Sequence, residues 1–246
     1  MRRDFFFAGL LWIVLTAAGM ILISRTDLFP FSAAHEADII DDAFRFLTLL
    51  GIPVFTFVLA GLIYSVIRFR QSGEMSEDGP PVRTNGPVTW TWLGVTSALA
   101  VFIIFNPGLK GIRELTANQE ADLIVQVEMR KWNWKFSYPQ YGITLVDAQE
   151  LVLPVDRRIR FEVASTDVIH SFWIPAFRMK VDAVPGQTNI LYATPTETGS
   201  FKDDINLRVQ CAELCGTGHS RMRAGLRILE SAEFEAWAAE QDAGSP

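Results

Sequence analysis

The sequence predicts a membrane-anchored all-β protein, in which N-terminal transmembrane helices precede a β-sandwich or small β-barrel. Three long apolar runs lie before residue 107, and almost none follow it. Beyond Ala121 the apolar residues recur with a period of two, which is typical of strands that have one buried face. The chain of 246 residues is long enough to contain both parts.

Each of the three apolar runs is long enough to cross a bilayer. They extend from Phe5 to Ile23, from Phe46 to Ile67 and from Val88 to Phe105. A helix needs roughly 17 to 25 apolar residues to span the hydrocarbon core. The runs have no polar face, which argues against buried helices of a soluble protein. The polar segment 71–86 contains glycines and prolines and predicts a turn, so the second and third runs are expected to form a hairpin.

The basic residues beside the runs predict how the chain is oriented in the membrane. Arg2 and Arg3 place the N-terminus in the cytoplasm, and Arg68 and Arg70 place the end of the second run there as well. The segment between the first two runs is acidic, which fits the outer side. Everything after Asn106 is therefore expected in the extracytoplasmic space.

The first run leaves two alternatives open, a retained helix or a cleavable signal peptide. Its apolar part is longer than the roughly 7 to 15 residues of a signal-peptide core, and the nearest small-residue cleavage site, Ser32–Ala34, lies well beyond its end. We favour the retained helix. The expected organisation is an N-terminal helix or signal (1–34), a transmembrane hairpin (35–111), an extracytoplasmic domain (112–230) and a C-terminal helix and tail (231–246).

The extracytoplasmic part contains several predicted strands. In Lys131–Tyr138 aromatic and polar residues alternate, which places Trp132, Trp134, Phe136 and Tyr138 on one face. Ser231 is expected to cap a terminal helix that runs through Trp237. Further strands are predicted around Leu123–Val127 and at Glu150–Leu153, Ile159–Ala164, Thr188–Thr194 and Gly225–Leu229.

The charge of the extracytoplasmic part limits the partners that it suits. Residues 111–246 contain 14 lysines and arginines and 19 aspartates and glutamates. An acidic surface favours a basic protein partner and argues against binding to nucleic acid.

One short loop collects side chains that bind soft metals. Cys211 and Cys215 are followed by His219 and Met222, and Gly216 and Gly218 lie between them. Thiolate, imidazole and thioether groups are the donors that copper favours. The glycines are expected to let the loop wrap tightly, because glycine adopts backbone angles that other residues avoid.

The donors are sufficient for a pair of copper ions. Two thiolates can bridge two ions, and each ion then needs one imidazole and one weak axial donor. The imidazoles are His219 and His170, which is expected between strands. Met222 is one axial donor, and the backbone carbonyl of Glu213 is the candidate for the other.

Three other interpretations of the loop remain open. The cysteines can form a disulfide, which an oxidising compartment favours. A Cys2His2 zinc site is chemically possible but leaves Met222 without a role. Met222 can also be a packing side chain, which would leave the other donors in place.

The motif C-x-E-x-C-x3-H-x2-M, preceded by DVIHSF and by a WNW strand behind a transmembrane hairpin, resembles subunit II of haem-copper cytochrome c oxidases. The similarity covers roughly residues 38–238, and the loop with its upstream histidine is highly specific. The resemblance implies a cupredoxin-like Greek-key β-barrel with a dinuclear copper centre, CuA. It also implies electron input from cytochrome c and electron transfer to the haems of subunit I in a proton-pumping oxidase.

The resemblance also implies roles for individual residues and partners. Trp132 is the candidate for receiving the electron, although its spacing is equally that of a core residue, and Asp167 is a candidate carboxylate beside the site or for docking. The carboxylate of Glu213 is expected to help bind magnesium at the interface with subunit I. Expected partners are subunits I and III and cytochrome c or a similar donor, in a bacterial plasma membrane with the copper domain on the periplasmic side. The expected copper ligands are His170, Cys211, Glu213, Cys215, His219 and Met222.

The sequence departs from this family in two places. Thr89 or Pro87 occupies the position where related hairpins have a glutamate at the mouth of a proton pathway, so the proton route through this subunit stays open. The segment KDDINLRVQ before Cys211 is longer than usual. Two competing functions are a membrane-tethered copper carrier and the quinol-oxidase relative that has lost its copper.

Overall fold

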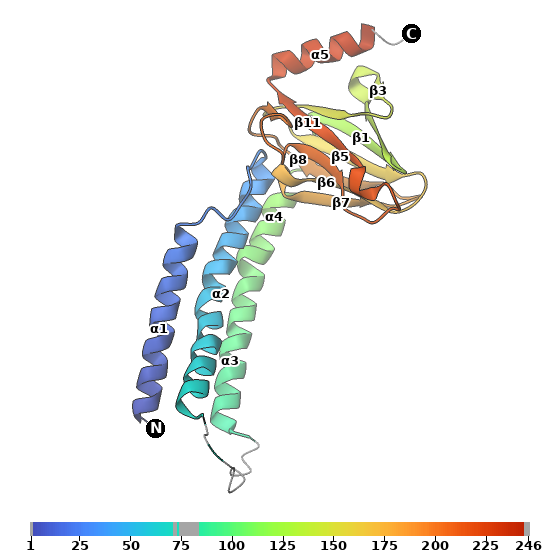
Figure 1. The fold of residues 1–246 in the computed structure, drawn as a ribbon. Coiled ribbons are helices and arrows are strands. Elements are labelled where there is room, and N and C mark those ends of the chain that lie inside the picture. The colour runs from blue at the N-terminus through green and yellow to red at the C-terminus, as the bar shows by residue number, and fades with distance from the viewer. Residues whose placement is uncertain (1, 71–72, 74–83, 244–246) are drawn as a thin grey trace. The chain divides into compact units, whose positions relative to one another are not determined.

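The computed structural model describes residues 2–70, 73 and 84–243 (Figure 1). Most of the predicted turn at 71–86 therefore lies outside the described residues. The chain divides into two compact units. One consists of Met1–Leu28 and Asp42–Glu114, and the other of Phe29–Asp41 and Leu115–Pro246.

The first unit is helical. It contains α1 (Arg2–Ser24), most of α2 (His35–Arg68) and α3 (Gly86–Ile103). All three are long and apolar enough to cross a membrane, as predicted. Polar contacts join α1 to α2. Among them, the Trp12 indole donates to the Pro53 carbonyl at 2.8 Å, and the Thr16 and Thr56 hydroxyls lie 2.7 Å apart.

The third membrane-spanning segment continues beyond its predicted end. After α3 the chain passes through the irregular turn Ile104–Leu109 into α4 (Lys110–Thr116). Asn106 interrupts the helix with an extended backbone (φ −140°, ψ 115°), because the residue before a proline avoids helical angles.

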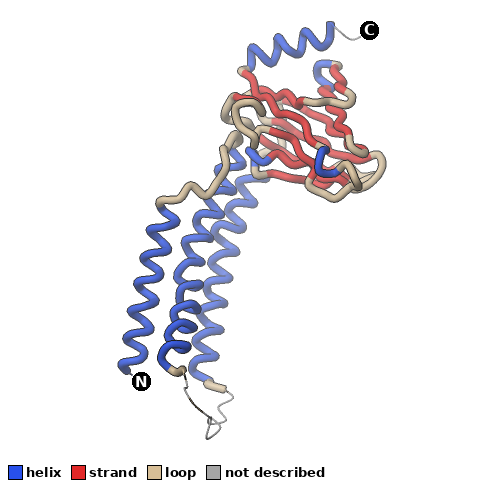
Figure 2. Tube along the Cα trace, viewed as in Figure 1, coloured by secondary structure: helices blue, strands red, loops and turns tan. Residues whose placement is uncertain are grey.

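The second unit is built on two β-sheets, which appear as the red strands of Figure 2. The first sheet has the order β3-β2-β1-β5-β8 and the second β4-β11-β10-β6-β7, with β9 beside β11. The pairs β1/β5 and β4/β11 are parallel and the other pairs are antiparallel. This two-layered arrangement confirms the predicted cupredoxin-like β domain. The strands are β1 (Leu123–Arg130), β2 (Asn133–Tyr138), β3 (Ile143–Leu145), β4 (Glu150–Pro154), β5 (Ile159–Ser165), β6 (His170–Ile174), β7 (Met179–Ala183), β8 (Asn189–Ala193), β9 (Gly199–Ser200), β10 (Arg208–Cys211) and β11 (Arg223–Leu229).

Aromatic side chains from both sheets fill the core of the domain. The ring centroid of Phe172 on β6 lies 6.2 Å from that of Trp134 on β2 and 5.2 Å from that of Phe161 on β5. All three rings are buried. Burying large apolar side chains stabilises the sheets that carry the loops at the end of the sandwich.

Three local predictions need correction. Trp132 does not lie on the buried face of β2, because Lys131 and Trp132 form the two-residue turn between the paired residues Arg130 and Asn133. His170 is the first residue of β6 rather than a residue between strands. The terminal helix α5 (Ser231–Ala243) begins as predicted and extends beyond Trp237.

The acidic segment before the second apolar run is part of the β unit. Ala33, Ala34 and Ala37 are completely buried, and the Ala33 amide donates to the Ala176 carbonyl at 3.0 Å. Nearby, Glu36 pairs with Arg158 at 2.8 Å, and both side chains are largely buried. A second ion pair, of 2.8 Å, joins Asp41 to Arg178, so residues 29–41 are fixed to the domain by packing, hydrogen bonds and charge.

Candidate metal centre

The ends of three neighbouring strands bring the predicted metal donors together. The central strand β10 ends at Cys211 and is hydrogen-bonded to both β6 and β11. Beyond it, the Ala212 amide donates to the Ser171 carbonyl, while the Cys211 amide donates to the Met222 carbonyl, both at 3.0 Å. The cysteine loop is therefore closed between the first residues of β6 and of β11.

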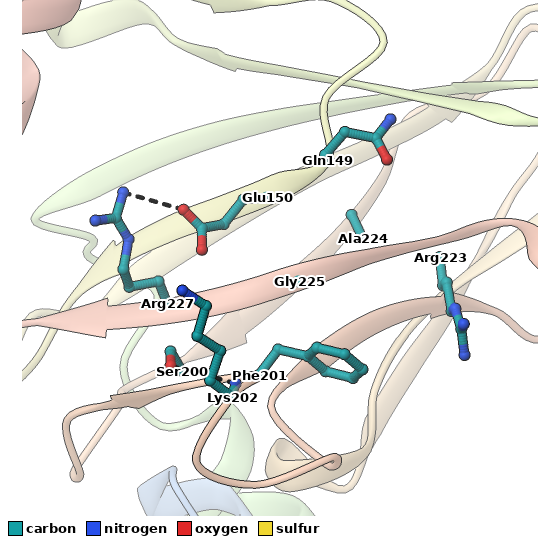
Figure 3. A pocket seen from close by; sticks show the side chains of 9 residues that line it. All are labelled: Gln149, Glu150, Ser200, Phe201, Lys202, Arg223, Ala224, Gly225 and Arg227. Carbon is teal, nitrogen blue, oxygen red and sulfur yellow. Dashed lines mark hydrogen bonds and ion pairs between the residues drawn. The ribbon is translucent and has the colours of Figure 1, made fainter.

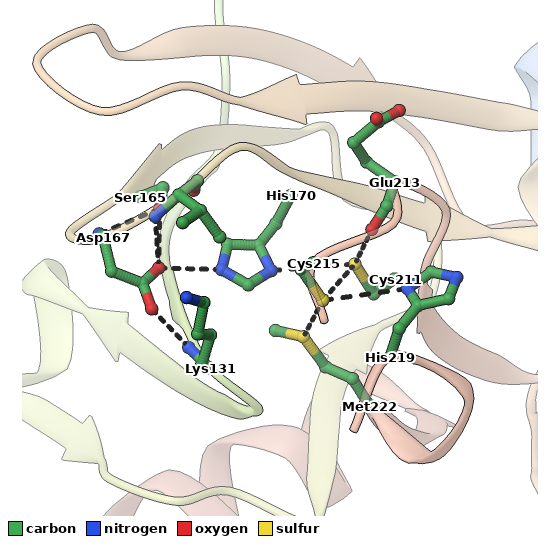
Figure 4. Close-up of polar contacts among 10 residues, drawn as sticks. Lys131, Ser165, Asp167, His170, Cys211, Glu213, Cys215, His219 and Met222 are labelled. Carbon is green, nitrogen blue, oxygen red and sulfur yellow. Dashed lines mark hydrogen bonds and ion pairs between the residues drawn. The ribbon is translucent and has the colours of Figure 1, made fainter. Parts of the chain in front are cut away.

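The two cysteine sulfurs form the middle of the cluster (Figure 4). The Sγ atoms of Cys211 and Cys215 lie 3.8 Å apart, and both cysteines are free. A disulfide bond has an S–S distance of about 2.05 Å, so the geometry is that of two separate thiols. A metal ion bound at about 2.3 Å from each sulfur fits between them, because twice that length exceeds their separation.

Each sulfur has one imidazole nitrogen and one weaker donor beside it. Sγ of Cys211 lies 3.8 Å from Nδ1 of His170 and 3.2 Å from the carbonyl oxygen of Glu213. Sγ of Cys215 lies 3.7 Å from Nδ1 of His219 and 3.8 Å from Sδ of Met222. The structure thus brings all six predicted residues into one cluster.

The cluster is shielded from solvent. His170 has no exposed surface, and the exposed fractions are 1% for Cys211, 4% for Cys215 and 1% for Met222. His219 is partly exposed. The donor set of two thiols, two imidazoles, a thioether and a carbonyl fits copper, for which sulfur and nitrogen donors are preferred.

The Cys215 thiol holds its proton firmly in the metal-free protein. Burial, together with the nearby Cys211, raises the pKa of the Cys215 thiol to about 11. Cysteine binds metals as the thiolate. A metal ion must therefore displace this proton when it binds at neutral pH.

Asp167 orients the buried imidazole. Its Oδ1 lies 2.8 Å from Nε2 of His170, and its Oδ2 accepts a hydrogen bond of 2.8 Å from the Lys131 amide. Burial would raise the pKa of Asp167, but these hydrogen bonds and that from the Val168 amide outweigh it and lower the pKa to about 2. The carboxylate therefore stays ionised and leaves Nδ1 of His170 free to face the sulfurs.

Glu213 presents its two ends to different surroundings. Figure 4 shows its carbonyl directed at the sulfurs, while its carboxylate points away from them. The residue is exposed. This arrangement fits the prediction that the carbonyl faces the cluster, and it leaves the carboxylate available for another contact.

Gly216 and Gly218 of the cysteine loop are required for different reasons, one conformational and one steric. Gly216 has a φ of +116°, in a region that favours glycine, as the tight loop predicts. Gly218 has φ −90° and ψ 0°, which other residues adopt. Its requirement is steric, because a Cβ atom there would overlap the ring of Trp132. No sequence pattern indicates this contact.

A hollow of about 520 Å³ lies elsewhere on the domain, over β11 (Figure 3). Its lining includes Lys202 and Gly225, together with Glu150 and Arg227, which form an ion pair of 3.0 Å. None of the six donor residues lines it. It is therefore separate from the candidate metal centre.

Comparisons with known proteins identify a single family. The family model described as cytochrome C oxidase subunit II, periplasmic domain, matches residues 142–228, which include all six donors. The chain is 31% identical to heme-copper oxidase subunit 2 of Aeropyrum pernix, covering 78% of this chain and 85% of that protein. It is 28% identical to cytochrome c oxidase subunit 2 of Thermostichus vulcanus, covering 85% and 77%. The solved periplasmic domain of subunit II of cytochrome oxidase from Bradyrhizobium japonicum is 33% identical, covering 50% of this chain and 96% of that one, with a TM-score of 0.46.

Proposed function

The chain belongs to the subunit II family of haem-copper oxidases, which includes cytochrome c oxidase subunit II, and from this we propose that it is the electron-input subunit of such an oxidase. In this role it accepts electrons from cytochrome c, or a similar donor, at a dinuclear copper centre. It passes them to the haems of subunit I, where oxygen is reduced to water and protons are pumped. The observation that carries the proposal is the convergence of six donors, in which two imidazoles, a thioether and a carbonyl surround two thiols 3.8 Å apart.

The residues of the chain hold the centre in a fixed geometry. Cys211 and Cys215 would hold the copper centre through their thiolates, His170 and His219 through their imidazoles, and Met222 and the Glu213 carbonyl as weak donors. Copper held by these donors would supply a centre that takes up and releases one electron. The strands that carry the donors and the Asp167 carboxylate that orients His170 keep these groups in place.

The surroundings of the centre follow from the same assignment. Trp132, which is 39% exposed, is the proposed point of electron input. The carboxylate of Glu213 helps to bind magnesium at the interface with subunit I. Subunits I and III are the membrane partners, and the copper domain lies on the periplasmic side of a bacterial plasma membrane.

The burial of the donors argues against the competing functions. A copper carrier needs ligands that a partner can reach, whereas His170, Cys211 and Met222 are each at most 1% exposed. A zinc site would leave Met222 and the Glu213 carbonyl without a role. A relative that has lost its copper would not need the complete donor set.

Substitution of one bridging cysteine tests the proposal. We expect the copper-loaded chain to give an electron-spin-resonance spectrum with seven hyperfine lines from two equivalent copper nuclei. Cys215→Ser removes one bridge and should abolish this pattern without changing the circular dichroism of the β domain, whose core it leaves intact. Ser220→Ala, in the same loop, is the matched control and should retain the seven lines. A Cys215→Ser protein with the wild-type spectrum would refute the assignment.

A further inference from the structure

Gly218 lies in the cysteine loop, directly before His219, and is buried. Its backbone angles, φ −90° and ψ 0°, do not require glycine. The turn of the loop therefore does not explain the residue. Its neighbours in space do.

The backbone of Gly218 is in contact with the indole of Trp132. A Cβ atom added at Gly218 would lie 2.3 Å from Cδ2, 2.5 Å from Cγ and 2.7 Å from Cε2 of this ring. These atoms belong to the rigid part of the side chain, because Cγ is the ring atom bonded to Cβ, and Cδ2 and Cε2 are the atoms where the two rings are fused. The overlap therefore cannot be relieved by bending a flexible end, and the whole indole or the loop would have to move.

Two further observations define where this indole lies: one concerns the ring, and the other concerns the turn that carries it. A Cβ atom added at Gly216 would lie at the ordinary distance of 3.5 Å from Cζ2 of Trp132, so the ring extends along the loop from Gly218 to Gly216. The turn that carries Trp132 is held by Asp167, which accepts the Lys131 amide and contacts His170. The turn that carries the indole is therefore linked through Asp167 to His170, and the ring itself lies against Gly218, the residue before His219.

We propose that Gly218 is a positioning residue, which seats the exposed indole of Trp132 against the cysteine loop beside His219, so that the ring stays next to the loop that carries the metal donors. The inference rests on the proposed function only for its consequence, which is fast electron transfer through Trp132. The seating itself is a property of the chain and exists without metal. Displacing a reacting group by about 1 Å can slow a reaction roughly 100-fold, which sets the scale of the effect.

The first test measures the seating without copper. The metal-free full chain is labelled with 5-fluorotryptophan, which reports on its seven tryptophans, and Trp132→Phe identifies the resonance of Trp132. Gly218→Ala should shift this resonance and leave those of the buried Trp134 and the membrane-embedded tryptophans unchanged. Gly225→Ala is the matched control, because a Cβ atom there meets only ordinary contacts of 3.6 to 3.8 Å. An unchanged Trp132 resonance in Gly218→Ala would overturn the proposal.

The second test measures the consequence in the assembled, copper-loaded oxidase. Gly218→Ala should keep the dinuclear copper spectrum and the KM for cytochrome c, while the rate of copper reduction at saturating donor falls roughly 10- to 100-fold. In a Trp132→Ala background the same substitution should have little further effect, because no ring remains for the added Cβ atom to displace. A wild-type reduction rate, or a loss of the copper spectrum that shows the loop moving instead of the ring, would overturn the assignment. Failure of the proposed function is distinguishable, because the wild-type protein would then lack the dinuclear spectrum itself.

Discussion

Asp167 connects the turn that carries Trp132 with the buried imidazole of His170. Removing its carboxylate with Asp167→Ala leaves Nε2 of His170 without its partner and frees the ring to rotate. Loss of such a partner typically lowers metal affinity 10- to 100-fold. We expect a decrease of this size in copper affinity, measured by competition with a chelator.

A neighbouring aspartate provides the control for this substitution. Asp182 is exposed on β7, which pairs with β6. Its replacement by alanine removes one negative charge, as Asp167→Ala does. Asp182→Ala should retain the wild-type copper affinity. Equal affinities in the two variants would show that Asp167 does not orient His170.

Met222 gives a second prediction at the scale of one side chain. Its sulfur lies 3.8 Å from that of Cys215 in a buried position, so Met222→Leu removes a weak donor while filling nearly the same volume. Two copper ions should still bind. The reduction potential should rise, because the oxidised centre loses an electron-donating thioether. A potentiometric titration that gives the wild-type potential would show that Met222 only packs in the core.

Single residues also mark how far sequence reasoning extends. The donor types and their spacing predicted all six members of the cluster, because both follow from the chemistry of soft metals. The position of Trp132 could not be predicted, since its alternation with Trp134 and Phe136 continues through a turn. The contact between Trp132 and Gly218 joins residues distant in the chain and leaves no periodic signal.

The segment Phe29–Asp41 is the element that the buried ion pair between Glu36 and Arg158 fixes to the β unit. Glu36 is 2% exposed and also accepts the Thr194 amide at 2.8 Å. Glu36→Ala leaves the charge of Arg158 without its partner in a largely buried position. We expect the free energy of unfolding of the β domain to fall by about 3–5 kcal/mol, measured by denaturant titration of the full chain in detergent.

Asp38, which lies in α2 like Glu36, provides the control for Glu36→Ala. Asp38 is exposed near the start of α2 and carries the same charge. Asp38→Ala removes only the exposed hydrogen bond that the carboxylate accepts from the Ser32 hydroxyl, and it should lower the free energy of unfolding by no more than about 1 kcal/mol. If both variants unfold alike, the pair between Glu36 and Arg158 does not fix the segment.

The first helix is expected to remain in the mature protein. Ala33 and Ala34 at the possible cleavage site are completely buried, and Ala34 pairs with Pro195. Cleavage there would remove both from the folded β unit. The mass of the purified protein should therefore include α1, and a mass that begins at His35 would contradict this prediction.

Element by element, the strands of six or more residues, which are β1, β2, β5 and β11, were all predicted, whereas β4 and β8 were the shorter strands that were found. The burial pattern of β5 alternates along its length, whereas four of the five residues of β6 are buried. A strand that is buried on both faces and begins with His170 and Ser171 has no period of two to detect. The short strand β10 is also missed, because it merges with the cysteine loop. The helices are found since length and composition alone define a membrane span.

At the scale of the whole molecule, the chain combines a helical unit that can cross a membrane with a β unit that holds buried soft donors. The chain belongs to the subunit II family, and the match to a relative in that family covers 78% of this chain. In the proposed function, the β unit supplies the rigid donors, and the helices anchor the electron-input site to the membrane that contains the partner subunits. The composition and charge of the chain are consistent with this division but do not determine the arrangement of the donors.

The central claim is that two thiolates hold a pair of copper ions, and metal analysis of the purified full chain tests it most directly. After loading and removal of unbound metal, we predict two copper ions for each chain, with the seven-line hyperfine pattern of a shared unpaired electron. Zinc in place of copper, or a single copper ion with a four-line pattern, would contradict the account.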